Sequence, residues 1–126
     1  WWAGKDRDGR TFESMALVYK TLAIIWALRA RDEIAWWCLE NPVGRLNKLV
    51  PELQLYGPQY FDPCDYGDPY TKRTGLWGEF MMPPVVEPVE PVEGSKMWRL
   101  PPSEDRQALR SVTPAGFARA FFEANR

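Results

Sequence analysis

The chain has 126 residues, 45% of them hydrophobic, and its 16 Lys and Arg against 17 Asp and Glu give a net charge of −1. The length suits one globular domain with one core. Because the net charge is close to zero, any contact with DNA would have to come from a local basic patch. There is no histidine, which excludes a His-based triad and the usual zinc sites, and two cysteines alone cannot complete a metal site, so we expect no metal. Because no run of roughly 20 apolar residues is present, we also expect no membrane span and a cytoplasmic protein.

The N-terminal third predicts one long helix. Residues 1–10 are charged and open with two tryptophans and no methionine, as in a sequence that begins inside a longer protein. From Thr11 to Arg31 apolar residues recur at helical spacing, with Glu13 in the first turn and cations in the last turn. The predicted buried face consists of Met15, Val18, Leu22, Ile25, Trp26 and Arg29.

A buried strand is predicted next. The continuous apolar run 34–39 ends at Glu40-Asn41-Pro42, and a helix followed by a buried strand suggests an α/β domain. After Pro42, residues 43–50 predict a short helix that Pro51 closes.

The second half of the chain predicts short strands, a loop and a last helix. Strands are expected near 59–61 and at 74–78. Residues 82–102 hold six prolines and a Val-Glu-Pro repeat, which favours an extended or disordered loop; a proline-motif ligand for a partner is the alternative. Thr113-Pro114 predicts an N-cap and first position, and Phe117, Phe121 and Ala124 form a buried stripe behind them.

Two polar clusters are candidates for a site. Glu40, at the end of a buried strand, is placed where open α/β sheets bind ligands, or it caps the helix expected near residue 43, and the sequence favours neither reading. Lys72 and Arg73 follow a turn and precede a strand, which is a suitable place to hold phosphate or a charged ligand. The alternative for this second cluster is a turn of solvated charges.

Together these clusters resemble a known family. Glu40-Asn41-Pro42, followed by Tyr66-Gly67-Asp68-Pro69-Tyr70-Thr71-Lys72-Arg73-Thr74 and by Arg110-Ser111-Val112-Thr113-Pro114, is similar to the C-terminal part of the catalytic domain of DNA (cytosine-5) methyltransferases, in particular their short, phage-like members. The resemblance covers most of the chain outside the proline-rich loop. It implies one partial α/β domain over residues 1–126, a partial Rossmann-like methyltransferase sheet flanked by helices, with the proline-rich loop and a C-terminal helix.

The resemblance also implies roles for single residues. Glu40 matches the glutamate that holds a flipped cytosine, and Asn41 matches the residue that orients this loop. Lys72 falls at the first arginine of a Gln-x-Arg-x-Arg motif, whereas Tyr70 replaces its glutamine and Thr74 its second arginine. The implied substrate-binding residues are Asn41, Lys72, Arg73 and Tyr70, the implied cofactor is S-adenosylmethionine, and the implied partner is DNA.

The sequence also departs from this family. It contains neither the Gly-rich cofactor loop nor the Pro-Cys nucleophile loop, and neither Cys38 nor Cys64 stands at the nucleophile position. We therefore expect the chain to be inactive alone, and cofactor binding by this chain alone is doubtful. Two alternatives stay open: a methyltransferase-like binding module or homodimer, and a non-catalytic DNA-binding module that uses Lys72 and Arg73 with Tyr66 and Tyr70.

Overall fold

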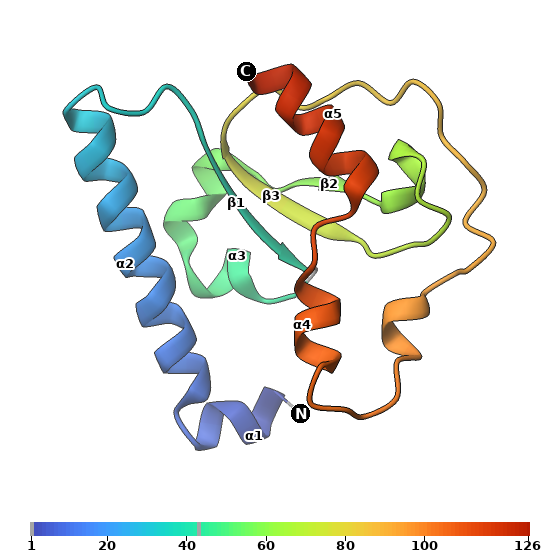
Figure 1. Cartoon of the computed structure of the whole chain (residues 1–126). Helices are drawn as coiled ribbons and strands as arrows, with labels where there is room; N and C mark the ends of the chain where they lie inside the picture. Colours follow the sequence, from blue (N-terminus) through green and yellow to red (C-terminus); the bar gives the residue numbers. More distant parts are fainter. Residues whose placement is uncertain (1, 43) are drawn as a thin grey trace.

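A computed structural model describes residues 2–42 and 44–126, and it shows a mixed α/β fold built around a small open sheet (Figure 1). The strands are β1 (Trp37–Pro42), β2 (Gln59–Phe61) and β3 (Thr74–Glu79), in the spatial order β1-β3-β2. Each strand was predicted near its observed place, although β1 begins and ends three residues later than the apolar run that suggested it.

All hydrogen-bonded strand pairs are antiparallel, so the expectation of a Rossmann-like parallel ladder is not met within this sheet. The third strand in the sequence lies in the middle, and β1 and β2 both pair with it. Because β1 and β2 are each antiparallel to β3, they run parallel to each other. β1 lies at one edge of the sheet, and its outer side carries no strand from the described residues.

The N-terminal region forms two helices. The predicted long helix is confirmed as α2 (Arg10–Ala30), although it starts after Gly9 in a left-handed conformation and has no side-chain cap from Thr11. The segment before it, for which the sequence predicted no element, forms a further short helix, α1 (Trp2–Arg7). The left-handed Gly9, which only a residue without Cβ adopts readily, sets the angle between the two helices.

α2 covers one face of the sheet with one side only. Leu22 is buried beside Trp37 and Trp77, and Val18 and Ile25 pack against this cluster. Two polar contacts fix the helix to the domain: Tyr19 Oη donates to Glu52 at 2.9 Å, and Arg29 pairs with Glu79 at 3.1 Å. Several other large apolar residues of α2 lie exposed: Phe12, Leu17 and Ile24, with Tyr19 and Trp26 partly so.

By length and composition alone, α2 meets the criterion for a helix that can cross a membrane. Its mean hydropathy reaches 1.3 over the best window, although the sequence contains no uninterrupted run of roughly 20 apolar residues. Core helices of soluble proteins meet the same criterion, and the location of the protein stays a prediction.

Between β1 and β2 the chain forms α3 (Leu46–Leu49) and the 3₁₀ helix η1 (Pro51–Tyr56). The helix predicted over 43–50 is therefore shorter than expected, and Val43 lies outside the described residues. Pro51 ends α3 as predicted, and Val50 and Leu53 on either side of it are fully buried under the sheet.

The opposite face of the sheet is covered by the C-terminal helix α5 (Ala115–Asn125), which crosses it in Figure 1. Phe117 is buried, and its ring stacks on Phe61 of β2 with centroids 3.7 Å apart. Phe121 packs against the same cluster, so the predicted stripe is confirmed at its two aromatic positions. The helix begins one residue later than expected, with Pro114 as its N-cap.

The proline-rich segment joins the sheet to the C-terminal helices. The loop predicted over 82–102 is confirmed except at 96–98, where the chain forms a 3₁₀ helix. Backbone hydrogen bonds from Val89 N to Cys64 O and from Glu93 N to Pro69 O tie the segment to the domain. Two short helices that the sequence did not predict follow, the 3₁₀ helix η3 (Lys96–Trp98) and α4 (Arg106–Ser111).

Candidate functional site

Glu40 lies near the C-terminal end of β1, opposite Leu76 of β3. Side chains alternate along a strand, so Glu40 shares its face with Cys38, which packs in the cluster under α5. Glu40 is exposed, and among the described residues its carboxylate has no hydrogen-bond or ion-pair partner. A free, exposed carboxylate at a strand end can accept hydrogen bonds from a ligand.

The helix-cap alternative for Glu40 is wrong. The next helix, α3, has Arg45 as its N-cap, five residues beyond Glu40, and no side chain caps it. A carboxylate interacts with a helix dipole only within the first turn. The position of Glu40 therefore has no explanation in helix capping.

Lys72 and Arg73 are held by Asp62, a residue that the sequence did not single out. One Asp62 oxygen accepts the backbone N–H of Lys72 at 2.9 Å, and the other lies 3.5 Å from the Arg73 guanidinium. The Arg73 guanidinium also lies 5.0 Å from the centroid of the Tyr60 ring. The Lys72 ammonium turns the other way and donates to the Val112 carbonyl at 3.4 Å. The solvated-turn reading is thus too simple, because Asp62 orders this turn.

The other predicted contacts lie in different surroundings. Asn41 donates from its amide to the Pro42 carbonyl at 2.9 Å, so it braces the chain directly after Glu40. Tyr70 is buried, with the Lys96 ammonium 4.3 Å from its ring centroid, and burial raises the pKa of its hydroxyl. Its observed contacts are internal, and a substrate contact for Tyr70 stays a prediction.

The sheet register brings the two sequence clusters to one end of the sheet. Pro42 of β1 pairs with Thr74 of β3, so the end of the Glu40 strand lies beside the start of the strand that Lys72 and Arg73 precede. Thr74 is buried, and its hydroxyl donates to the Lys72 carbonyl at 2.7 Å, which fixes the approach to the strand. One carboxylate and two cations, about 30 residues apart in sequence, thus belong to one region.

Neither cysteine is suited to nucleophilic attack. Burial, with a smaller effect of the Glu40 carboxylate, raises the pKa of Cys38 to about 12. Burial and the nearby carboxylates of Asp65 and Asp62 also raise the pKa of Cys64. Because the thiolate is the nucleophile, both shifts make these thiols less reactive near neutral pH. Both are free thiols in the structure.

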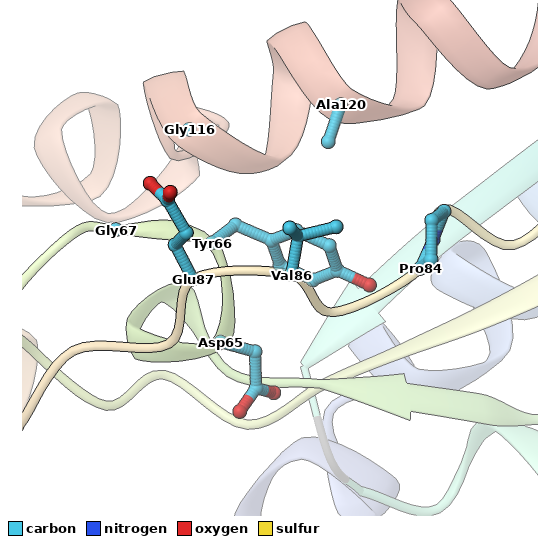
Figure 2. Close-up of a pocket in the computed structure, with 8 residues that line it drawn as sticks. All are labelled: Asp65, Tyr66, Gly67, Pro84, Val86, Glu87, Gly116 and Ala120. Atoms are coloured by element: carbon cyan, nitrogen blue, oxygen red, sulfur yellow. The ribbon is translucent and has the colours of Figure 1, made fainter.

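A shallow cavity of about 260 Å³ lies elsewhere, between α5 and the start of the proline-rich segment (Figure 2). Tyr66 forms part of its wall, and its hydroxyl donates to the Pro83 carbonyl at 2.8 Å. The carboxylates of Asp65 and Glu87 point away from each other in Figure 2, so the cavity does not assemble a pair of acids. Among the described residues no cluster of His, Cys, Asp and Glu could hold a metal ion.

The sequence analysis also did not single out Trp98, an exposed tryptophan. Trp98 at the end of η3 is 74% exposed, and the Arg110 guanidinium of α4 lies 5.1 Å from its ring centroid. The signal available in the sequence was a tryptophan flanked by Lys96 and Arg99 inside a segment otherwise rich in proline and glutamate.

Comparisons of the chain with family models, with curated proteins and with solved structures found no match.

Proposed function

We propose that the chain is the C-terminal portion of a DNA (cytosine-5) methyltransferase-like protein, which in complete form transfers a methyl group from S-adenosylmethionine to cytosine in DNA. The observation that carries the proposal is the register of β1 and β3. Because Pro42 pairs with Thr74, Glu40 and Asn41 near the end of β1 lie at the same end of the sheet as Lys72 and Arg73, which precede β3.

The fold supports this proposal in a second way. β1 and β2 run parallel with the antiparallel β3 between them, and mixed sheets are common among large α/β folds. On this reading the chain supplies one end of a Rossmann-like sheet, and further parallel strands continue it beyond the open side of β1. The exposed apolar residues of α2 beside that edge fit the same reading.

In this proposal Glu40 hydrogen-bonds the ring nitrogen and amino group of an extruded cytosine, and Lys72 and Arg73 contact the DNA. The complete protein supplies S-adenosylmethionine and a nucleophilic thiolate, because the shifted pKa values of Cys38 and Cys64 make both poor nucleophiles. The chain alone is therefore inactive.

The test is methyl transfer from labelled S-adenosylmethionine to duplex DNA. We expect no transfer by the 126-residue chain, and transfer once the chain is joined to a segment that supplies the Gly-rich cofactor loop and the Pro-Cys loop. In the active protein Glu40→Gln lowers the rate by about 100-fold or more, because a positioned acid-base group is lost. Glu87→Gln, an exposed glutamate in the proline-rich segment, is the matched control and leaves the rate unchanged.

Two results would contradict the proposal. Transfer by the chain alone would show that it is not a fragment of the active site. A rate unaffected by Glu40→Gln would leave Glu40 as an edge-strand charge that discourages pairing with other sheets.

A second candidate is a non-catalytic methyltransferase-like binding or dimerisation module, favoured by the exposed outer side of α2. Leu17 and Ile24 are seven residues apart, so they lie on one face of the helix, and both are largely exposed. A homodimer would bury them. Light scattering would then give twice the mass of one chain, and a double substitution to lysine would return it to one; a wild-type monomer at high concentration would eliminate this candidate.

A further inference from the structure

A basic and aromatic surface lies next to the candidate site, built from three segments that are distant in sequence. Hydrogen bonds connect the first two: Thr71 N donates to the Gly94 carbonyl at 2.9 Å, and the hydroxyls of Thr71 and Ser95 are 3.2 Å apart. We call this the Trp98 surface. Its members are Lys72, Lys96, Trp98, Arg99 and Arg110.

The third segment joins through α4. Arg110 packs over the Trp98 ring, and the Lys72 ammonium donates to the Val112 carbonyl two residues beyond Arg110. Figure 1 shows the short helix η3, in orange, and α4 on the same side of the fold. The three segments therefore lie next to one another.

The charge of the Trp98 surface is positive although the whole chain carries −1. Lys96 is neutralised by Glu93 at 2.6 Å. Lys72, Arg99 and Arg110 form no ion pair with the described residues, and Arg99 makes only a long hydrogen bond of 3.5 Å to the Glu93 carbonyl. Three cations without carboxylate partners around one exposed indole favour a polyanion as the ligand.

The exposed indole narrows the class of polyanion. Trp98 is 74% exposed although it is among the largest apolar side chains, and Arg110 is its one ring partner among the described residues. Proteins that bind single-stranded nucleic acid combine cations along the phosphate backbone with aromatic rings on which bases stack. Bases inside a duplex have their faces covered by neighbouring bases, so the ring requires an unpaired base.

We propose that the Trp98 surface binds nucleic acid, with the Trp98 indole stacked on an unpaired base and Lys72, Arg99 and Arg110 on the flanking phosphates. The proposal rests on the proposed function, since it names the residues by which the chain holds its DNA. It adds Trp98 to the residues that contact DNA.

The experiment measures fluorescence anisotropy of a labelled single-stranded 12-mer DNA titrated with the 126-residue chain at low salt. We expect Trp98→Ala to weaken binding by about 10-fold, the effect of losing one stacked base. Trp98→Phe retains most of the affinity because it keeps an aromatic face. Phe122→Ala, which removes a 63% exposed aromatic of α5, is the matched control and changes the affinity by less than about two-fold.

A second probe separates stacking from charge. An abasic 12-mer carries the same phosphates without bases, so wild type binds it more weakly, and Trp98→Ala causes no further loss. Equal loss on both probes would overturn the stacking contact. Circular dichroism and urea unfolding of Trp98→Ala serve as the control for the fold; we expect both to match the wild type, so that a loss of binding reports on the surface.

Three further outcomes of the titration would overturn the inference. Binding that Trp98→Ala leaves unchanged overturns the inference and leaves the proposed function intact. No binding at low salt overturns it as well, and the methyl-transfer assay then decides the proposed function separately. A Trp98→Ala variant that keeps its DNA affinity but loses self-association would assign this surface to a protein contact instead.

Discussion

Replacing Phe117 by alanine tests how α5 is held on the sheet. The Phe117 side chain is only 4% exposed, and its ring stacks on Phe61 at 3.7 Å and an interplanar angle of 10°. It also meets the rings of Tyr66 and Phe121 at 5.3 and 5.6 Å. Phe117 is therefore the one residue of α5 that is buried in the core cluster on this face of the sheet.

The expected loss is about 3–5 kcal/mol in the free energy of unfolding. Transfer of the side chain out of water accounts for about 1.5–3 kcal/mol, and the cavity left beside Phe61 adds the rest. The polar contacts at the two ends of α5 remain in the variant: Gly116 N donates to Asp68 at 2.9 Å, and Asn125 bonds to both backbone groups of Met81. Because these hold the helix in place, the cavity cannot close fully.

Urea unfolding followed by tryptophan fluorescence and circular dichroism measures this loss. With a slope of about 1.5 kcal/mol per molar urea, the midpoint falls by about 2–3 M. The matched control is Phe122→Ala, the same change at the neighbouring exposed position of the same helix, for which we expect a loss below about 0.5 kcal/mol.

A Phe117→Ala loss of less than about 1 kcal/mol, or equal losses for the two variants, would refute the reasoning. Either result would mean that α5 is not anchored by its buried ring.

Two further predictions concern backbone packing and titration. Gly116→Ala loses at least about 2 kcal/mol in urea unfolding, because a Cβ there would lie 2.0 Å from the Tyr66 carbonyl, whereas Gly4→Ala in open space is neutral or slightly stabilising; equal effects would contradict the close approach of α5. Stability falls as pH rises from about 9 toward 12, since the Cys38 thiol ionises near 9.0 when unfolded and near 12 when folded, so the unfolded state binds fewer protons in that window. Cys38→Ala makes this fall shallower, and urea midpoints in the two proteins that decline in parallel would show that Cys38 is not the cause.

Local patterns in the sequence located most elements of the fold. The apolar spacing of α2 and the proline before α5 are local signals, and both helices were found within one residue at their starts. The position of β3 between β1 and β2 was not predictable in this way, because the pairing of Trp37 with Glu79 joins residues 42 apart. No local pattern encodes strand order or direction.

The candidate site was predicted only in part, because the sequence shows charged residues directly but not the contacts between distant segments. Glu40, Lys72 and Arg73 carry charges that stand out in the sequence, and the register brings them to one end of the sheet. Asp62 was missed because its role depends on a turn ten residues long, which ends at the Lys72 amide. The contact between Trp98 and Arg110 was missed because both lie on short helices without periodic apolar residues.

The central place of β3 has a consequence for how this chain folds. Neither β1 nor β2 can form a ladder until β3 is present, and β3 is the last of the three to leave the ribosome. A nascent chain that ends before Thr74 would therefore hold two extended segments with no hydrogen-bonded neighbour. Closing the roughly 30-residue loop between β1 and β3 costs chain entropy before the contacts that it permits can form, so sheet formation is the slow, nonlocal step of folding. Until then the apolar residues of α2 and β1 are open to other chains, and aggregation competes with folding at that stage.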